Sequence, residues 1–220
     1  MDRGYLVDQK QIMDFSKIRR EYIQEPMALE SLDPDPMRVF DDWMKEAYKY
    51  YGEECNAMTL ATSDRTGRPS ARTVLLKGIT SNGFIFYTNY QSRKGQQIDQ
   101  NPRAAILFYW AVLDRQIRIE GPVIKVSDQQ SDLYFQSRPP GSRISAMASP
   151  QSSRITMEEL QTKRKALELS DNFPRPSHWG GYEVKGEYFE FWNGQENRFH
   201  DRFIYEQMKD GTFDRYRIAP

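Results

Sequence analysis

The feature that most constrains this chain is a run of five short strand-like segments between residues 57 and 126. Turn sequences, DRTG and SNG, separate the first three segments. Strands joined by such short turns favour an antiparallel sheet or a small barrel over a βαβ array. The five segments are Ala57–Ser63, Pro69–Ile79, Gly83–Asn89, Arg103–Trp110 and Arg115–Val126.

Helical patterns come before this region. We expect a short helix around Ile12–Tyr22. A second helix is expected to begin at Pro36, since proline suits the first helical position, and Gly52 can end it. Apolar residues recur through this second helix at helical spacing: Phe40, Trp43, Met44, Ala47 and Tyr51.

Helices and then strands follow the middle region. Ser127 can cap a helix that stops before Pro139, and Thr156 with Glu159 forms a capping box for a helix through Leu169. The end of the chain is again strand-like. The expected strands are Gly181–Val184, Tyr188–Trp192, Arg202–Glu206 and Phe213–Arg217.

These patterns predict a mixed α+β fold, mainly β, in which a barrel carries late-inserted helices and one arm in front. A length of 220 residues suits one domain with a sizeable core. We divide it into an N-terminal arm with helices (1–55), barrel strands (56–126), a helical segment (127–172) and C-terminal strands (173–220).

Charge and cysteine content limit the kinds of partner. The chain has 31 Lys and Arg against 31 Asp and Glu, so nothing draws it generally to nucleic acid or to an anionic membrane. Any anion must be held by local clusters. A single cysteine, Cys55, allows no intrachain disulfide, and one cysteine with two histidines argues against a zinc site. No stretch reaches the roughly 18 apolar residues of a membrane span. We expect a cytoplasmic protein.

Several common catalytic motifs are missing from the sequence. It contains no GxGxxG after a strand and no Walker-type phosphate loop. It also lacks a GxSxG elbow and an HExxH pair. These absences disfavour a Rossmann dehydrogenase, a P-loop NTPase, an α/β-hydrolase and a zincin.

Two basic segments are candidates for anion binding. In ARTVLLKG, Arg72 and Lys77 are five residues apart, so in a regular strand they point to opposite faces and would serve two different anions unless a bulge intervenes. In SRKG, Arg93 and Lys94 stand where a helix begins, and free amides there would suit a phosphate. The alternative for each segment is that its basic side chains are ordinary surface charges exposed to water.

A third candidate is YFQSRPPGS. Tyr134 and Arg138 are four apart and share a helix face, and a Pro-Pro-Gly turn could fold the Ser142 hydroxyl back towards them. A phenol, a guanidinium and a hydroxyl together would form a compact phosphate site. The alternative is a helix-end arginine on the macrodipole, with Tyr134 packed in the core.

The segment WNGQENRFHDR carries groups that recognise flat polar rings. If it is extended, Arg198, His200 and Arg202 project on one side. Arginine can stack on a ring, and histidine titrates near neutrality. The alternative is a polar hairpin with surface charges. Gln116 and the QSS sequence that starts at Gln151 could hydrogen-bond the edge of a heterocycle.

Taken together, these segments resemble the pyridoxine 5′-phosphate oxidase family. The resemblance runs from RREY at Arg19–Tyr22 to the terminal RIAP, with the landmarks RTVLLK, FYTN, SRK, RQIRIEG, YFQSRP, QSS, WGGY, EFWNG and NRFHDR in family order. It implies a split β-barrel that binds flavin mononucleotide (FMN) at the interface of a homodimer. The sequence departs locally from the family at Pro140 and Gly141.

The resemblance also implies site residues. Catalytic roles fall on Arg198 and His200, and no metal is implied. Arg72 and Lys94 would hold the FMN phosphate. The cofactor contacts correspond to Arg72, Thr73, Val74, Leu75, Leu76, Lys77, Tyr87, Thr88, Arg93, Lys94, Gln116, Gln151, Ser152, Trp192 and Arg202. The substrate contacts correspond to Arg19, Tyr22, Lys77, Tyr134, Arg138, Ser142, Arg198 and His200.

The activity implied is that of a pyridoxal 5′-phosphate synthase, in vitamin B6 cofactor biosynthesis and salvage. Pyridoxine or pyridoxamine 5′-phosphate would give a hydride to FMN, and O2 would reoxidise the flavin and yield hydrogen peroxide. His200 would act as a base or only position the substrate. Two rival hypotheses are a flavin reductase, because the fold does not fix the function, and a non-catalytic flavin or pyridoxal-phosphate carrier.

Overall fold

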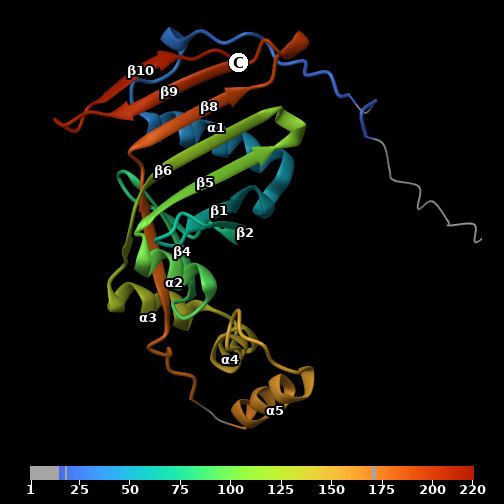
Figure 1. The fold of residues 1–220 in the computed structure, drawn as a ribbon, viewed down its shortest axis with the longest axis vertical. Helices are drawn as coiled ribbons and strands as arrows, with labels where there is room; N and C mark the ends of the chain where they lie inside the picture. The colour runs from blue at the N-terminus through green and yellow to red at the C-terminus, as the bar shows by residue number, and fades with distance from the viewer. Residues whose placement is uncertain (1–14, 18, 170–171) are drawn as a thin grey trace, which may run out of the picture.

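The computed structural model describes residues 15–17, 19–169 and 172–220. Ten antiparallel strands form one curled sheet, and helices cover its ends (Figure 1). The strands are β1 (Ala57–Ser63), β2 (Pro69–Leu75), β3 (Gly78–Ile79), β4 (Gly83–Asn89), β5 (Arg103–Trp110), β6 (Arg115–Lys125), β7 (Trp179–Lys185), β8 (Tyr188–Asn193), β9 (Asp201–Gln207) and β10 (Phe213–Arg217). The α-helices are α1 (Pro36–Tyr51), α2 (Arg93–Gln100), α3 (Asp128–Ser137), α4 (Pro140–Ala148) and α5 (Met157–Glu168).

The long strand β6 is where the sheet divides. Its residues Arg115–Glu120 pair with β8, whereas Val123–Lys125 pair with β7, which continues to β4 and β3. On its other edge β6 pairs with β5, followed by β1 and β2. One strand therefore belongs to two diverging halves, as in a split barrel.

The core fills the inside of the curled sheet. Helix α1 closes it, with Asp35 capping the first turn and Pro36 in the first position. The fully buried Phe40 ring contacts Phe84 and Phe108 edge-on at centroid distances of 4.8 and 5.4 Å, and Trp43 contacts Phe191 at 5.3 Å. The expected apolar stripe of α1 is thus confirmed as its core face.

Two expectations about the first half of the chain are wrong. The helix around residues 12–22 lies partly outside the described residues, and residues 15–17 and 19–22 are not helical. Most of their side chains are exposed, so a helix there would have no apolar face to bury. The strand expected over Pro69–Ile79 breaks at Leu76, which turns into the core, while the Lys77 amide bonds to Ile85 of β4. This break is the departure from regular alternation that the Arg72–Lys77 spacing left open.

Two expectations about loops are also wrong. The Pro-Pro-Gly sequence is no turn, because Pro140 starts α4 and places Ser142 in its first turn. The segment before β9 is not extended either. Residues Glu196–Arg198 form a short 3₁₀ turn in which Asn197 and Arg198 have φ of 52° and 66°. Arg198 and His200 therefore do not alternate as strand residues.

Candidate functional site

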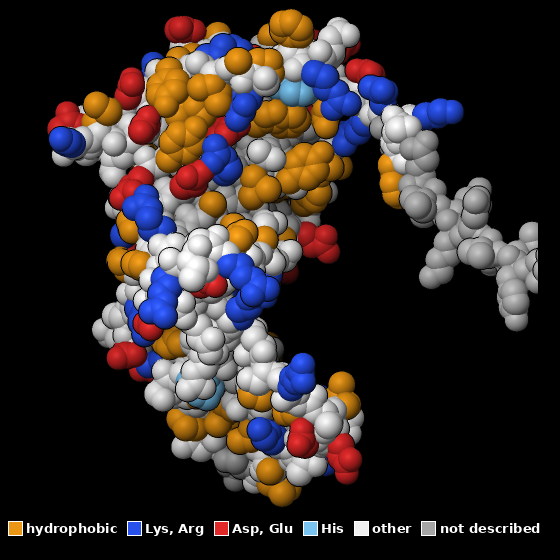
Figure 2. All heavy atoms as spheres, viewed as in Figure 1, with side chains coloured by type: hydrophobic (Ala, Val, Ile, Leu, Met, Phe, Trp, Pro, Cys, Tyr) orange, Lys and Arg blue, Asp and Glu red, His pale blue; other side chains and the backbone are white. Residues whose placement is uncertain are grey.

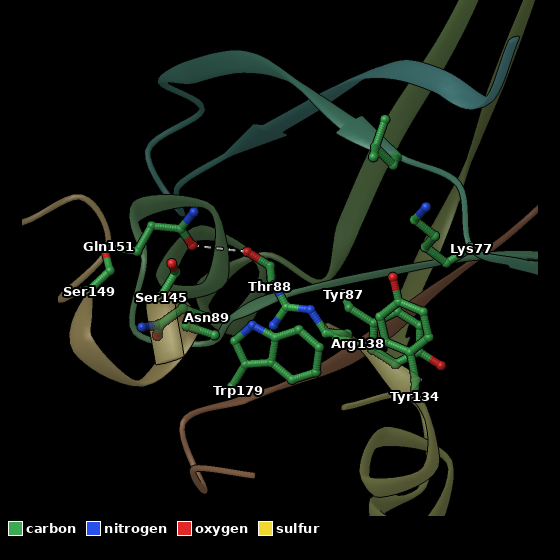
Figure 3. A pocket seen from close by; sticks show the side chains of 12 residues that line it. Lys77, Tyr87, Thr88, Asn89, Tyr134, Arg138, Ser145, Ser149, Gln151 and Trp179 are labelled. Atoms are coloured by element: carbon green, nitrogen blue, oxygen red, sulfur yellow. Dashed lines mark hydrogen bonds between the residues drawn. The ribbon is translucent and has the colours of Figure 1, made fainter. Parts of the chain in front are cut away.

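A cavity of about 410 Å³ opens beside β4, between α3, α4 and the start of β7 (Figure 3). The chain segment that crosses from β2 to β4 forms another of its walls. Many residues that the sequence indicated meet here. The lining residues are Leu75, Lys77, Tyr87, Thr88, Asn89, Tyr134, Arg138, Ser145, Ala146, Ser149, Gln151 and Trp179.

Lys94 lies under one end of this cavity. Helix α2 begins at Arg93 as expected, Ser92 caps it, and Lys94 in its first turn is only 8% exposed. Its ammonium group donates to Thr88 Oγ1 at 3.1 Å and to Gln151 Oε1 at 3.4 Å. Burial, with a further contribution from the positive charge of Arg72, lowers the pKa of Lys94 to about 8. The lysine is thus a buried cation held by neutral groups.

Arg72 has the same kind of surroundings. Its guanidinium donates to the Leu60 carbonyl at 3.1 Å, to Thr62 Oγ1 at 2.7 Å and to Ser70. The two hydroxyls in turn donate to the buried amide oxygen of Gln97, at 2.7 and 2.6 Å. Burial and the nearby charge of Arg93 lower the pKa of Arg72. A chain of neutral hydrogen bonds therefore fixes Arg72 without neutralising it.

We call Arg72, Thr88, Lys94 and Gln151 the cation cluster. None of the ion pairs formed within residues 15–17, 19–169 and 172–220 involves Arg72 or Lys94. Lys94 is buried and Arg72 is half-buried, and cations removed from water without a carboxylate are costly unless an anion completes the site. With the amino end of α2 beside them, they fit the phosphate of FMN.

Aromatic rings form the opposite wall of the cavity. The Tyr87 and Tyr134 rings stack at 3.8 Å, and Trp179 lies parallel to both, at 5.7 and 6.2 Å. The guanidinium carbon of Arg138 lies 4.7 Å from the Trp179 ring centroid. Arg138 Nη1 is buried without a hydrogen-bond partner, and burial lowers the pKa of this arginine. This wall therefore offers a ligand a further cation that has no carboxylate partner among the described residues.

A separate group, the hairpin cluster of Tyr22, Trp192, Arg198 and His200, lies beside β8 and β9. The Tyr22 ring meets Trp192 and His200 edge-on at 5.3 and 5.2 Å, and Arg198 lies over it at 5.5 Å. A side chain at Gly194 would come within 2.9 Å of Tyr22, so this close approach requires glycine.

His200 has one ring nitrogen already engaged. The backbone amide of Gln195 donates to His200 Nδ1 at 3.0 Å. In the neutral ring the proton therefore lies on Nε2, which can donate to a ligand. Burial, followed by the charges of Arg198 and Arg202, lowers the pKa of His200 and favours this neutral form.

Three expected cofactor residues form a row across neighbouring strands. Gln116 is in register with Trp192, and Trp192 with Arg202, so their side chains share one face of the sheet. Glu190, which is 2% exposed, accepts from Arg202 Nε at 2.7 Å and from Arg118 at 2.7 Å. Arg202 is thus held by a carboxylate, unlike the cations of the cavity.

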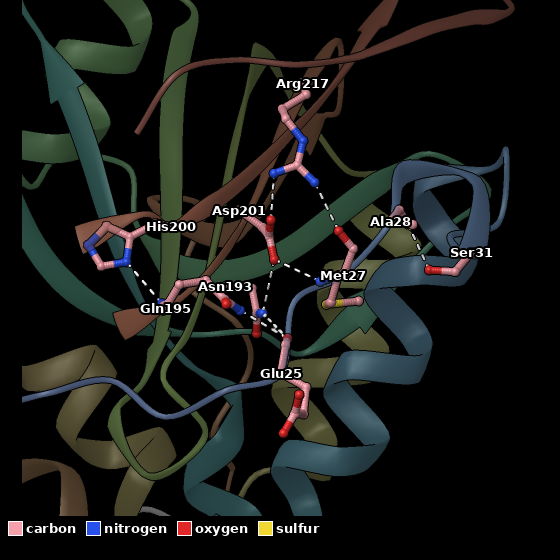
Figure 4. Close-up of polar contacts among 9 residues, drawn as sticks. All are labelled: Glu25, Met27, Ala28, Ser31, Asn193, Gln195, His200, Asp201 and Arg217. Carbon is pink, nitrogen blue, oxygen red and sulfur yellow. Dashed lines mark hydrogen bonds and ion pairs between the residues drawn. The ribbon is translucent and has the colours of Figure 1, made fainter. Parts of the chain in front are cut away.

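Side chains at the end of β8, at the start of β9 and between the two strands fasten the N-terminal arm (Figure 4). Asn193 and Gln195 both donate to the Glu25 carbonyl, at 3.1 and 2.9 Å. The buried Asp201 accepts from the Met27 amide at 2.8 Å. Arg20 pairs with the buried Asp114 at 2.7 Å. The arm therefore places the Tyr22 ring against His200, whereas Arg19 is exposed.

The chain does not bring its two groups together. No residue after Trp179 lines the cavity, and Figure 1 shows β8 and β9 at the opposite end of the molecule from α4. Other expected residues lie outside the cavity within a single chain. Arg93 and Ser152 are exposed, Leu76 is in the core, and α4 presents Ser145 to the cavity where Ser142 was expected. Thr73 and Val74 belong to β2 and do not line the cavity.

Trp179 is the main lining residue to which the sequence reasoning gave no role. It belongs to the WGGY landmark, which was noted without a function. Pairing of β7 with β4 sets Trp179 opposite Asn89 and beside Tyr87, and only the tertiary structure establishes this pairing. Asn89, Ser145 and Ser149 also line the cavity and had no signal of their own.

Comparisons with known proteins cover nearly the whole chain. The sequence model of pyridoxamine 5′-phosphate oxidase matches residues 44–166, and that of the pyridoxine 5′-phosphate oxidase C-terminal dimerisation region matches residues 179–220. Proteins named pyridoxine/pyridoxamine 5′-phosphate oxidase are similar. The one from Paraburkholderia phymatum is 47% identical over 92% of this chain and 97% of its own, and the one from Rubrobacter xylanophilus is 48% identical over 94% and 97%.

Solved structures share the architecture. PhzG from Burkholderia lata, in complex with tetrahydrophenazine-1-carboxylic acid, is 27% identical with a TM-score of 0.82, over 87% of this chain and 95% of its own. An FMN-binding protein from Nostoc punctiforme, related to pyridoxamine 5′-phosphate oxidase, is 20% identical with a TM-score of 0.69, over 86% and 100%. The expected split-barrel fold is confirmed.

Proposed function

Because this chain belongs to the pyridoxamine 5′-phosphate oxidase family, we propose that it converts pyridoxine or pyridoxamine 5′-phosphate to pyridoxal 5′-phosphate. FMN is the cofactor. Bound FMN would supply a hydride acceptor that O2 reoxidises with release of hydrogen peroxide. The alcohol would also lose its proton to give the aldehyde, and the amine would pass through an imine that water hydrolyses with release of ammonia. This activity would place the protein in vitamin B6 biosynthesis and salvage, in the cytoplasm.

The observation that carries the proposal is a pair of cationic sites: Arg138 in the cavity wall, and the cation cluster, which reaches the cavity through Thr88 and Gln151. The cation cluster fits a first phosphate, and Arg138, with the Tyr134 hydroxyl and Lys77 nearby, fits a second (Figure 3). An oxidase that joins FMN to a phosphorylated substrate needs two such sites within reach of each other. A flavin reductase acting on a ligand without phosphate would need only the first.

The chain's own residues would then bind and orient. Arg138 and Tyr134 would hold the substrate phosphate, while the stacked rings exclude water from that wall. Arg198 would lie against the substrate ring, and His200 would donate from Nε2 to a polar ring substituent. Holding the reacting carbon within contact of the cofactor matters, because a displacement of about 1 Å can cost about a hundredfold in rate.

A homodimer would unite the two groups. Within one chain the hairpin cluster and the cavity lie apart, and the segment from 179 to 220 matches a dimerisation region. The face shown in Figure 2 is hollowed between the strand-rich end and helices α4 and α5, with Lys and Arg side chains on the wall of the hollow. A second copy could bring its Arg198 and His200 to this hollow.

The test is oxygen-dependent formation of the aldehyde by the yellow, FMN-loaded protein. Removing one partner of a charged hydrogen bond costs about 2–5 kcal/mol. Arg72→Ala should therefore release FMN, whereas Arg138→Ala should stay yellow and raise the KM for the phosphorylated substrate. Flavin reduction by a nicotinamide without aldehyde formation would identify a reductase. Tight pyridoxal-phosphate binding without turnover would identify a carrier.

A further inference from the structure

The way in which Arg138 is held suggests a role for a residue outside the expected site. Arg138 follows α3, where its amide bonds to the Phe135 carbonyl. Its guanidinium is half-buried, yet it takes part in none of the ion pairs among the described residues, and Nη1 has no hydrogen-bond partner. A half-buried cation that no carboxylate orients needs another support.

The support is the face of Trp179. The guanidinium carbon lies 4.7 Å from the Trp179 centroid and 5.8 Å from that of Phe135. Tryptophan gives the strongest attraction of this kind, and the attraction grows where water is excluded, as at this ring with its 6% exposure. A guanidinium over a ring keeps its in-plane N–H groups free for a planar or tetrahedral anion.

Trp179 is itself held rigidly on two sides. Its ring lies parallel to Tyr87 and Tyr134 and meets Phe135 edge-on at 5.0 Å. Its carbonyl accepts from Arg175 at 2.7 Å, and Arg175 also bonds to Asp128 and Asp132 of α3, at 2.8 and 2.5 Å. The start of β7 and the helix that carries Tyr134 are therefore fixed to each other.

We propose that Trp179 is a positioning residue for the substrate phosphate. Its neutral ring orients Arg138 towards the cavity and leaves the positive charge of Arg138 free to pair with that phosphate. A carboxylate in the same place would orient Arg138 equally well, but it would compete with the incoming phosphate for the same N–H groups. The Trp179 ring, which has no negative charge, does not compete with the phosphate. The inference rests on the proposed function and adds the residue that sets its preference for a phosphorylated ligand.

The experiment measures equilibrium binding of pyridoxal 5′-phosphate and of pyridoxal to the FMN-loaded protein. A cation–π contact at a desolvated site contributes about 1–2 kcal/mol, which corresponds to roughly a tenfold change in affinity. Trp179→Leu should weaken pyridoxal 5′-phosphate binding about tenfold and leave pyridoxal binding unchanged. Trp179→Phe keeps an aromatic face and should weaken pyridoxal 5′-phosphate binding about threefold. This variant tests the proposal if the leucine variant folds poorly.

A double-mutant cycle separates positioning from general packing. In an Arg138→Gln background, Trp179→Leu should have no further effect on the phosphate ligand, since its action runs through Arg138. The matched control is Trp43→Leu, because Trp43 is also buried beneath an arginine, with Arg115 at 4.6 Å, but does not line the cavity. That variant should lose stability and keep the ratio of the two affinities.

Equal weakening of both ligands by Trp179→Leu, or a full effect in the Arg138→Gln background, would overturn the inference. So would a parent protein that binds the two ligands equally. A parent protein that oxidises neither phosphorylated substrate but discriminates the ligands through Trp179 and Arg138 would refute the proposed function alone. The two ideas therefore fail in distinguishable ways.

Discussion

At the scale of single residues, Lys94 shows how burial prepares a group for a ligand. Its pKa of about 8 means that the folded protein holds this proton less tightly than the unfolded chain does. The energetic cost of the buried charge is thus fully present below pH 8 and disappears as the pH rises towards 10.5. A bound phosphate reverses this balance, because it stabilises the protonated amine.

Binding of FMN to the apoprotein should therefore depend on pH through Lys94. The phosphate stays doubly charged above about pH 7, so above that pH the change in affinity comes from a group on the protein. Above pH 8 a proton must be taken up on binding, and the Kd should rise by up to about tenfold per pH unit. Fluorescence titration from pH 6.5 to 9.5 would measure it. Lys94→Arg stays protonated and should give a flat profile; an unchanged inflection in that variant would contradict the assignment.

His200 poses the question of base or hydrogen-bond donor. Since Nδ1 is occupied by the Gln195 amide, we expect His200 to act through a proton on Nε2. His200→Gln places an amide near the Nε2 position and should keep turnover within about tenfold of the parent, whereas His200→Ala should lose about a hundredfold. Steady-state rates across pH would check this. If His200→Gln removed the acidic limb of the profile together with nearly all activity, a general base would be indicated instead.

At the scale of elements, the N-terminal arm is held by side chains rather than by secondary structure. Asp201 at the start of β9 accepts from the Met27 amide and pairs with Arg217, which also bonds to the Met27 carbonyl (Figure 4). The helix expected around Ile12–Tyr22 is absent from the described residues of that range, and an irregular segment held by side chains leaves no periodic signal in the sequence.

Removing the charge of Asp201 should therefore release the arm. Hydrogen bonds to charged groups are worth about 1.5–3 kcal/mol, so Asp201→Asn should lower the free energy of unfolding by about that amount. Limited proteolysis before residue 27 should become faster than in the parent. Asp210→Asn is the matched control, because Asp210 is an exposed carboxylate that accepts hydrogen bonds from Thr212 in a turn. Equal protection of the arm in both variants would show that Asp201 does not fasten it.

At the scale of the whole molecule, the separation of the two groups makes a dimer testable by complementation. Arg138→Ala raises the KM at the cavity and Arg198→Ala damages the hairpin cluster, so at a substrate concentration far below that raised KM each variant alone should be nearly inactive. If each site takes its cavity from one copy and its hairpin from the other, a mixed dimer has one intact site. An equal mixture that exchanges subunits should recover about a quarter of the parent activity, because about half of the dimers are mixed.

The control mixture is Arg138→Ala with Lys94→Ala. Mixed dimers would then carry one damaged cavity of each kind and no intact site, so activity should not return. Light scattering should also give about twice the chain mass of 25.9 kDa. A monomer with full activity at assay concentration would exclude the shared site.

The sequence by itself determined the elements and much of the site chemistry. Periodicity located α1 and most strands, because apolar side chains that repeat at a fixed spacing must face one core. Local capping by Ser127 and by Thr156 with Glu159 fixed two helix starts, since these bonds span only three residues. The ordered series of landmarks likewise indicated the family, the cofactor and the basic residues.

Only the tertiary structure decided how distant residues meet. Periodicity does not predict the break in the strand at Leu76, the stacking of Arg138 on the Trp179 ring, or the hydrogen bond from the Gln195 amide to His200 Nδ1. Each depends on contacts between segments far apart in the chain or on backbone angles outside regular elements. The separation of the hairpin cluster from the cavity is likewise a property of how β6 divides the sheet. No local pattern in the sequence records it, because the partners of a strand are chosen by the packing of the whole barrel.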